Sequence, residues 1–382
     1  MADFIFKISP NIMLGSYLTA RLGQFVKEWG TKYMLILDPD LQDFDIGDKI
    51  QNSLTERKID FFVFNDIPVT PDSSDIERAL KLAREAHVHG VIVAGDTKTA
   101  NIARAICALY NEVHDLYDYM EGACPTSAPL PLINIPTTMR DAFLFTDRTP
   151  IIDARSRKTK ILKTQNGLCK LALFDPNLSI NMTETQIASN SIQTLCIAIE
   201  AYISQKSNFF SDTILEKAIE LLANGFDGSP NISSSASSEI LLAQGGCMTS
   251  LGAALSSIGP ASLLALTIDG RFQITSSLTA GILLPYVIED AAKYKSDKLA
   301  NVAKIMRLAD QTTDTKTAVN ALSENIRNRL ALANLPARLK DLSVSIEQLA
   351  LAAEDAGQLD FINGLPRSMN ADDLFDLIKQ SY

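Results

Sequence analysis

The stretch GVIVAGDTKTANIARAICAL, Gly90–Leu109, decides the fold class of this chain. Its first six residues, Gly90–Gly95, form an apolar run typical of a strand that is buried on both faces. The turn Gly95-Asp96-Thr97-Lys98 then leads into a helical pattern over Ala100–Tyr110. A buried strand that turns directly into a helix is the repeating unit of a parallel sheet with helices on its faces.

Short apolar runs of the same kind precede and follow this unit, with helical patterns between them. One such helix, at 74–88, is expected to begin with the capping box Ser74-x-x-Glu77. The predicted strands are Met34–Asp38, Asp60–Phe64, Gly90–Gly95, Leu132–Ile135 and Leu171–Phe174. The alternation predicts an α/β domain of the dinucleotide-binding type, built on a parallel sheet, over residues 1–178.

The sequence changes character after Asp175-Pro176, because strand-like runs disappear there. Thr183-x-x-Gln186 is a capping box that opens a long helical pattern through Ser204. Further helices are expected at 211–224, 233–256, 279–295, 298–309, 314–333, 343–357 and 371–381. The sequence therefore predicts a second, all-helical domain over residues 179–382.

The charge balance argues against a nucleic-acid-binding protein. The 382 residues include 35 Lys and Arg and 45 Asp and Glu, a net charge of −10, whereas nucleic-acid binders usually carry a basic stripe. The densest basic run is short and has no interleaved aromatic residues, which favours a solvated loop or a single phosphate contact. It comprises Arg155, Arg157, Lys158, Lys160 and Lys163.

No signal peptide and no membrane-spanning segment are visible in the sequence. The first residues, MADFIFKISPNIMLG, lack a basic region followed by an apolar one. The longest apolar stretch, LSSIGPASLLALTI, is shorter than the roughly 20 residues that span a bilayer. The five cysteines are scattered without C-x-x-C spacing, which is typical of a reduced, cytoplasmic protein. We therefore expect a cytoplasmic chain with no membrane partner.

Polar residues follow three of the predicted strands, at the edge where parallel sheets bind ligands. Asp38 is suited to a ribose hydroxyl, and the backbone amides of Gly95-Asp96-Thr97-Lys98 are suited to an anion because a helix follows them. Thr137 and Thr138 stand at the third strand end. An aspartate at a strand end also often serves as a helix cap or turn residue, and the sequence leaves both roles open.

Together these segments resemble the iron-containing, or group III, alcohol dehydrogenases, which are relatives of glycerol dehydrogenase and dehydroquinate synthase. The resemblance covers nearly the whole chain, in order and in spacing. It rests on KISPNIMLGSYLTARLGQFVKEWGTKYMLILD, GVIVAGDTKTANIARAICAL, PLPLINIPTT, LALFDPNL, AIEAYIS and GILLPYVIE. It implies a dehydroquinate synthase-like fold, in which the first of these segments forms a hairpin and a strand.

The resemblance implies a divalent metal, usually iron or zinc, held by one Asp and three His of the helical domain. Counted from Glu200-Ala201-Tyr202 and from Leu284-Pro285, these positions hold Gln193, Ile197, Ser262 and Ser276. The three histidines of the chain, His87, His89 and His114, all lie outside that domain. Amide, alkyl and hydroxyl side chains are poor ligands for iron or zinc. We therefore expect no metal.

The resemblance also implies NAD(P), but the glycine-rich turn is altered. Asp96 adds bulk and negative charge where the family has Gly-Gly-Gly-Ser beside the pyrophosphate, with Lys98 and Arg104 available to offset that charge. Met139–Leu144 replaces a loop of small residues. We expect weak NAD(P) binding at best. The candidate cofactor-binding residues are Asp38, Gly95, Asp96, Thr97, Lys98, Thr137, Thr138 and Lys160, with Lys158 as the alternative to Lys160.

These departures predict a pseudoenzyme, a family member that is degenerate as a metal-dependent dehydrogenase. The alternative is a metal-independent, NAD(P)-dependent oxidoreductase acting on a small alcohol or aldehyde, and a third hypothesis is a lyase or synthase on the same fold. Tyr202/Lys206 and Tyr294/Lys298 have Tyr-x-x-x-Lys spacing, which chance explains better than a reductase site. No catalytic residue is assigned. The expected partners are a small molecule in the inter-domain cleft and further copies of this chain, as a dimer or larger homo-oligomer.

Overall fold

The structure is a computed structural model that describes residues 9–41, 45–179, 182–227 and 236–382. The chain divides into two compact units, Met1–Asn181 and Met182–Tyr382. The sequence places this boundary between residues 178 and 179.

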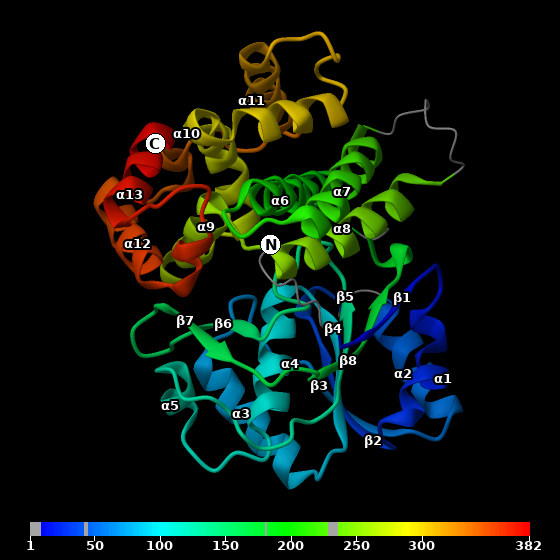
Figure 1. Cartoon of the computed structure of the whole chain (residues 1–382). Helices are drawn as coiled ribbons and strands as arrows, with labels where there is room; N and C mark the ends of the chain where they lie inside the picture. Colours follow the sequence, from blue (N-terminus) through cyan, green and yellow to red (C-terminus); the bar gives the residue numbers. More distant parts are fainter. Residues whose placement is uncertain (1–8, 42–44, 180–181, 228–235) are drawn as a thin grey trace. The chain divides into compact units, whose positions relative to one another are not determined.

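The N-terminal unit is built on a six-stranded, all-parallel sheet with the strand order β1-β8-β5-β4-β2-β3 (Figure 1). Its strands are β1 (Asn11–Leu14), β2 (Lys32–Leu37), β3 (Asp60–Phe64), β4 (Gly90–Gly95), β5 (Leu132–Pro136) and β8 (Cys169–Phe174). A separate antiparallel pair joins β6 (Arg148–Ile152) to β7 (Thr159–Lys163). The predicted parallel sheet is confirmed, and β3 and β4 have the predicted bounds.

Helices cover both faces of this sheet (Figure 1). On one face, Met34 and Val91 pack in a core with α3 (Ser73–Glu85) and α4 (Thr97–Leu109). Their chain neighbours Leu35 and Ile92 pack in the core of the opposite face, with α1 (Leu22–Phe25) and α2 (Ile46–Glu56). Successive strand residues point to opposite faces, so these unbroken apolar runs bury both sides. The remaining helical segments of the unit are α5 (Leu116–Met120) and the 3-10 turns Thr19–Arg21, Val26–Glu28, Pro39–Leu41 and Pro176–Ser179.

Local details of this unit differ from the sequence-based expectations. The capping box of α3 is formed by Asp72 and Asp75 rather than by Ser74 and Glu77, because the N-cap lies two residues earlier than predicted. Helix α4 begins at Thr97 rather than Ala100, because Asp96 caps it. The hairpin expected at the start of the chain includes residues 7 and 8, which lie outside the described residues.

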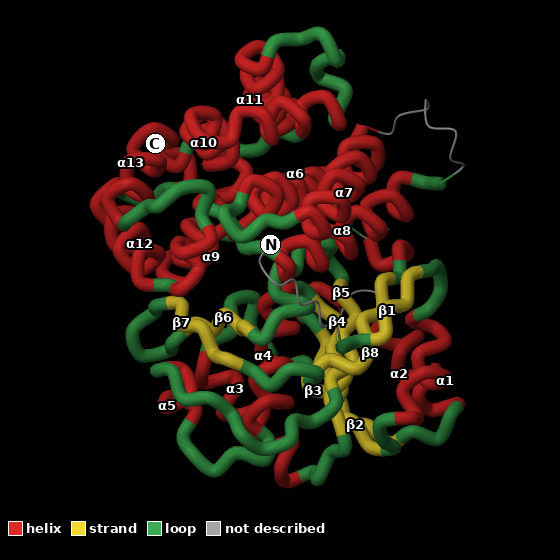
Figure 2. Tube along the Cα trace, in the orientation of Figure 1, coloured by secondary structure: helices red, strands yellow, loops and turns green. Residues whose placement is uncertain are grey.

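The second unit is helical throughout its described residues, 182–227 and 236–382, as predicted (Figure 2). The capping box of Thr183 and Gln186 opens its first helix, also as predicted. The helices are α6 (Glu184–Ile203), α7 (Phe209–Asp227), α8 (Ser238–Leu255), α9 (Pro260–Phe272), α10 (Ser276–Ile305), α11 (Thr315–Leu332), α12 (Ile346–Gln358) and α13 (Ala371–Ser381), with 3-10 turns at Leu339–Leu342 and Asp360–Gly364.

Two features of the helical unit escaped the sequence pattern. The helices expected at 279–295 and 298–309 are one element, α10, whose backbone leaves the helical region at Lys295 (φ −131°, ψ 28°). Helix α9 was not predicted, because it is buried on nearly all sides and so lacks the polar face that helical periodicity requires. The start of the helix predicted at 233 lies outside the described residues.

No single helix within the described residues is long and apolar enough to cross a membrane. Helices α8 and α9, bent by 97° relative to each other, meet that test of length and composition only as a pair.

Candidate functional site

The carboxyl ends of β2 and β4 bring two of the predicted site residues, Asp38 and Asp96, into contact. Asp38 follows β2 and is buried. Its Oδ2 accepts a hydrogen bond from the backbone N–H of Asp96 at 3.0 Å and another from the Thr99 hydroxyl at 2.8 Å. Asp38 therefore holds the turn that begins α4.

Asp96 is the N-cap of α4. Its Oδ1 accepts hydrogen bonds from the backbone N–H groups of Lys98 at 2.9 Å and Thr99 at 3.1 Å. The first amides of a helix have no partner within the helix, and they commonly bind an anion or water. Here three amides of the turn, including that of Asp96 itself, donate to carboxylates of the chain's own Asp38 and Asp96.

The neighbouring strand β5 lies beside this turn. The N–H of Thr137 donates to the carbonyl oxygen of Gly95 at 3.0 Å. Arg140 reaches back to the turn, with Nη2 3.4 Å from Oδ2 of Asp96 and Nε 3.4 Å from the Thr138 hydroxyl. The sequence does not mark Arg140 as a site residue, because no motif fixes the register of the loop after Pro136.

The remaining candidate cofactor residues divide between this edge and another part of the unit. At the edge, Oγ1 of Thr97 is buried without a hydrogen-bond partner, and Nζ of Lys98 lies 3.5 Å from the Thr70 hydroxyl. Lys160 lies on β7 instead, where its Nζ is 2.9 Å from Oε1 of Glu121. Seven of the eight candidates thus lie at the ends of β2, β4 and β5 or at the start of α4, while Lys160 on β7 forms an ion pair with Glu121.

Arg104 is bound by a different carboxylate from the one expected. Its guanidinium forms a buried ion pair with Asp141 and donates to Oδ1 of Asn101 at 2.7 Å. Asp141 also accepts the N–H of Phe143 at 2.9 Å. The buried pair therefore fixes the loop at 139–144, and Arg140 is the arginine beside Asp96.

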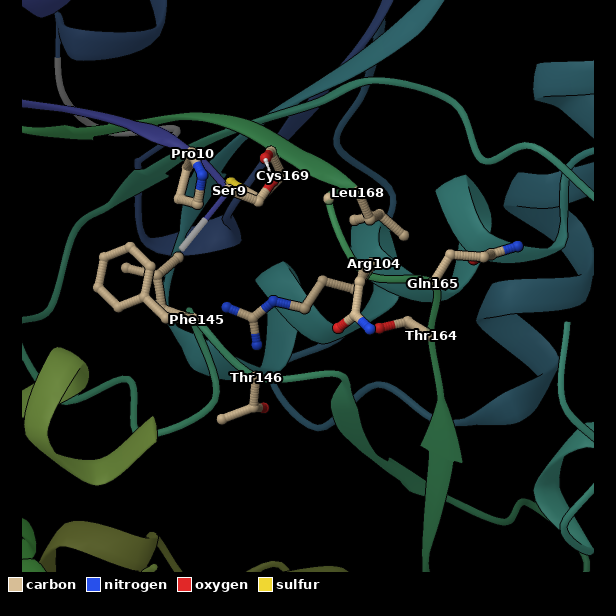
Figure 3. A pocket seen from close by; sticks show the side chains of 12 residues that line it. Ser9, Pro10, Arg104, Phe145, Thr146, Thr164, Gln165, Leu168 and Cys169 are labelled. Atoms are coloured by element: carbon tan, nitrogen blue, oxygen red, sulfur yellow. Dashed lines mark hydrogen bonds between the residues drawn. The ribbon is translucent and has the colours of Figure 1, made fainter. Parts of the chain in front are cut away.

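A pocket of about 110 Å³ opens beside Arg104, whose guanidinium points into it (Figure 3). Its walls come from residues 9–10, 144–146 and 164–169. Two of its polar groups are already bonded within the chain: the Ser9 hydroxyl donates to the Cys169 carbonyl and the Thr146 hydroxyl to that of Phe143, each at 3.0 Å. Because Asp141 balances the charge of Arg104, the buried ion pair offers a ligand no net charge.

In the helical unit, the four positions at which the family resemblance places metal ligands lie on three helices, α6, α9 and α10. Gln193 and Ile197 lie one turn apart on α6, and Nε2 of Gln193 donates to Oγ of Ser276, the first residue of α10, at 3.2 Å. Ser262, in the first turn of α9, has its Oγ 4.0 Å from Sγ of Cys196 on α6. Two of the four positions, Gln193 and Ser276, are therefore in direct contact.

The nearby carboxylate, Glu200, is bound to the N-terminus of α9. It accepts backbone hydrogen bonds from Ala261 at 2.6 Å, Ser262 at 3.0 Å and Gly259 at 3.3 Å. A Cβ atom on Gly259 would lie only 2.7 Å from Cβ of Glu200, so this close approach requires glycine. Burial raises the pKa of Glu200 and that of the neighbouring Cys196 thiol. Both side chains are therefore buried in the interior of the helical unit, where Glu200 binds the backbone at the start of α9.

The side chains present do not fit iron or zinc. The four positions supply one amide, two hydroxyls and one alkyl group, whereas these metals bind carboxylate, imidazole and thiolate ligands. Cys196 is held as the thiol, because burial raises its pKa. Across the parts of the chain that the structure describes, no group of three or more His, Cys, Asp or Glu is arranged to hold a metal ion.

Lys298 of the second Tyr-x-x-x-Lys motif contacts Tyr202 of the first. Nζ of Lys298 lies 4.5 Å from the centre of the Tyr202 ring and donates to the carbonyl oxygen of Tyr202 and to Asp212. Burial, followed by the hydrogen bond to Glu216, raises the pKa of Tyr202. A tyrosine that supplies a proton in catalysis needs a pKa near the operating pH, so this pair is not suited to that role.

Two family models match the chain almost end to end. "Iron-containing alcohol dehydrogenase" matches residues 9–176, and "Fe-containing alcohol dehydrogenase family, C-terminal" matches residues 187–382. A curated relative, 1,3-propanediol dehydrogenase of Citrobacter freundii, is 22% identical over 355 residues, which cover 92% of each chain.

Solved structures agree with this match. A crystal structure of 1,3-propanediol oxidoreductase aligns over 100% of both chains with a TM-score of 0.91 and 20% identity. Sulfoacetaldehyde reductase from Bifidobacterium kashiwanohense, solved in complex with NAD+, aligns over 100% of this chain and 99% of that one, with a TM-score of 0.85 and 15% identity. The chain has the fold of these proteins, and by the two family models it belongs to the iron-containing alcohol dehydrogenase family.

Proposed function

We propose that this chain is a member of the family that has lost metal-dependent dehydrogenase chemistry and binds NAD(P) weakly at best. The observation that carries the proposal is the hydrogen bond between Gln193 and Ser276, which fills two ligand positions with an amide and a hydroxyl. The remaining positions, Ile197 and Ser262, offer an alkyl group and another hydroxyl. A hydride transfer to a carbonyl needs an electrophile at the carbonyl oxygen. In the family a bound metal has that role, and these four side chains are not suited to bind one.

The turn between β4 and α4 supports the nucleotide part of this proposal. Amides suited to a pyrophosphate donate to Asp38 and Asp96 instead. A further negative charge brought into this site would be repelled by both carboxylates, and the repulsion grows as the site is desolvated. Weak nucleotide binding is the expected consequence.

Metal content tests the first part of the proposal. Protein purified without chelators, then incubated with Fe²⁺ or Zn²⁺ and desalted, is expected to retain no stoichiometric metal by elemental analysis. About one tightly held metal per chain would overturn the proposal.

Activity separates this proposal from the alternative, a metal-independent NAD(P)-dependent oxidoreductase acting on a small alcohol or aldehyde. The assay is NAD(P)-linked turnover of small alcohols, diols and aldehydes, with and without added metal, and no turnover is expected. Activity that Lys160→Ala abolishes and Lys163→Ala leaves intact would favour the alternative. Lys163 is the matched control because it lies on the same strand as Lys160.

Partners and location belong to the same proposal. The acidic net charge favours a chain that binds no nucleic acid, and the five cysteines, all free in the structure, favour a reducing cytoplasm. We propose a homo-oligomer that binds a small molecule and no membrane. Size-exclusion chromatography with light scattering tests the oligomer, and a monomer at micromolar concentration would contradict it.

A further inference from the structure

We infer that Asp96 is the residue that excludes phosphate-bearing ligands from the N-terminus of α4, because its carboxylate takes the place such a ligand would occupy. The inference deepens the proposed function and rests on it, since it names the side chain that weakens nucleotide binding.

The contacts of Asp96 are those of a bound anion. One oxygen, Oδ1, accepts two backbone amides of the first helical turn, from Lys98 and Thr99. The other oxygen, Oδ2, lies 3.4 Å from a guanidinium nitrogen of Arg140. Helix amides on one side and an arginine on the other are the donors that proteins commonly offer to a phosphate.

Asp38 closes the same turn from the other side. It takes the N–H of Asp96 and the hydroxyl of Thr99, so it restrains the turn as well as adding charge. At Gly95, a Cβ would lie 3.0 Å from Oδ2 of Asp38 and 2.9 Å from Cβ of Thr99. The turn is thus tightly packed, and a ligand phosphate would have to displace the Asp96 side chain to reach the amides.

Charge and burial give the same result. Asp96 and Arg140 are largely buried, with side chains 22% and 11% exposed. Removing the Asp96 carboxylate leaves Arg140 and two backbone amides without that acceptor, in a place where water is scarce. In such a variant an external anion takes the place of the missing carboxylate. In the wild type it has to compete with the Asp96 carboxylate for the same donors.

The test is binding of inorganic pyrophosphate, measured by isothermal titration calorimetry at low salt, to the wild type, Asp96→Gly and Asp96→Asn. Pyrophosphate needs only the amide and guanidinium donors, so the bulky loop at 139–144 does not obscure the result. Glycine is well tolerated at an N-cap, so Asp96→Gly should fold. We expect it to bind at least about tenfold more tightly than the wild type, since a hydrogen bond to a charged group contributes that much or more. Asp96→Asn should fall between the two.

Two controls make the result specific. Asp314→Gly removes one negative charge from the N-cap of α11 in the helical unit and should leave pyrophosphate binding at the wild-type level. Adding Arg140→Ala to Asp96→Gly should abolish most of the gain.

Equal binding by the wild type and a folded Asp96→Gly would overturn the inference, whether both bind or neither does. If Asp96→Gly does not fold, Asp96→Asn decides, and it must bind more tightly than the wild type. The proposed function fails separately: stoichiometric metal or dehydrogenase turnover would overturn it, and neither outcome would change this comparison of pyrophosphate affinities.

Discussion

The turn before α4 and the four positions of the helical unit at which the family resemblance places metal ligands differ in the kind of side chain that they present. In the turn, charges remain: the carboxylates of Asp96 and Asp38 accept the amides, and Arg140 lies beside Asp96. In the helical unit, two of the four positions hold the neutral side chains of Gln193 and Ser276, which are joined by a hydrogen bond. The first site holds charges that partner one another, whereas the second has none at the ligand positions.

The difference teaches which change is easy to reverse. In the turn before α4, the backbone amides and Arg140 remain as donors beside the Asp96 carboxylate, so a single substitution at Asp96 makes them available to a ligand. A set of positions that holds only neutral side chains would need a new ligand at each of them before it could bind a metal. Breaking the buried ion pair between Arg104 and Asp141 should also cost far more stability than breaking the hydrogen bond between Gln193 and Ser276. The reason is that an unpaired buried charge is unfavourable.

The largest expected effect comes from restoring the ligands together. The variant Gln193→Asp, Ile197→His, Ser262→His, Ser276→His is expected to bind one Zn²⁺ or Co²⁺ per chain, because a carboxylate and three imidazoles suit either metal. Elemental analysis and the visible absorption of the Co²⁺ form measure it.

The matched control retains Ile197 and changes only the other three positions, and it should bind the metal much more weakly. A folded four-residue variant that takes up no metal would show that the four positions do not converge as the register requires.

Arg104→Ala should be the most damaging single change. It leaves Asp141 buried without its partner, and the loss of one member of a buried ion pair costs about 3–5 kcal/mol. Urea unfolding followed by fluorescence measures this in the N-terminal unit, because the chain's single tryptophan, Trp29, lies there.

The double variant Arg104→Ala, Asp141→Ala tests the cause. It should recover a large part of the lost stability, since neither charge then remains buried alone. If Arg104→Ala were as stable as the wild type, the expectation that loss of a buried ion-pair partner costs more than loss of a neutral hydrogen bond would be wrong.

Glu112→Gln tests another carboxylate of the N-terminal unit that accepts hydrogen bonds from backbone amides. Glu112 accepts the Tyr119 hydroxyl at 2.6 Å and the N–H groups of Thr126 at 2.7 Å and Ser127 at 2.6 Å, and these hydrogen bonds lower its pKa from the ordinary 4.5. Hydrogen bonds to charged groups contribute about 1.5–3 kcal/mol each, so we expect a loss of about 2 kcal/mol at pH 7.

The pH dependence of this loss has a definite sign. Because folding lowers the pKa, the stability that Glu112 contributes is present above pH 4.5 and disappears as the pH falls through the folded value. Melting temperatures of wild type and variant should therefore converge in acid, and a gap that widens below pH 4.5 would contradict the assignment.

The smallest effect is expected at the neutral cluster. Ser276→Ala removes the hydroxyl that Gln193 donates to, and a neutral hydrogen bond contributes about 0.5–1.5 kcal/mol. Thermal unfolding followed by helix circular dichroism measures it, with Ser277→Ala as the neighbouring control for the 2.6 Å bond to Ser189. A loss of stability as large as that of Arg104→Ala would contradict the expectation that this neutral hydrogen bond contributes less than the buried ion pair.

Much of the fold could be predicted because burial leaves a strong pattern. The strand Gly90–Gly95 was predicted to the residue, since a run buried on both faces is apolar throughout. Helix α9 escaped for the same reason, because complete burial removes the polar face that marks a helix. The Tyr-x-x-x-Lys spacing at 202–206 and 294–298 is explained better by chance than by a reductase site, and Lys298 contacts Tyr202 on a different helix.

The site was predicted in position more than in chemistry. The register that placed Gln193 and Ser276 together depends on helical spacing and on short motifs, both of which the sequence contains. The pairing of Arg104 with Asp141, and of Arg140 with Asp96, depends instead on how a loop folds back over a sheet edge. Side-chain identity alone does not determine which of two nearby arginines meets which aspartate.

Helix α4 has a consequence for solvent exchange. Every residue from Thr99 to Leu109 is buried, so its central amides should exchange with deuterium only when the whole N-terminal unit opens. First-turn amides of most helices exchange early because they have no intrahelical partner, but those of Lys98 and Thr99 are bonded to a side chain anchored on this slow element. The exchange rates of these two amides therefore report how often their hydrogen bonds to the Asp96 carboxylate break. The measurement requires neither a ligand nor a substitution.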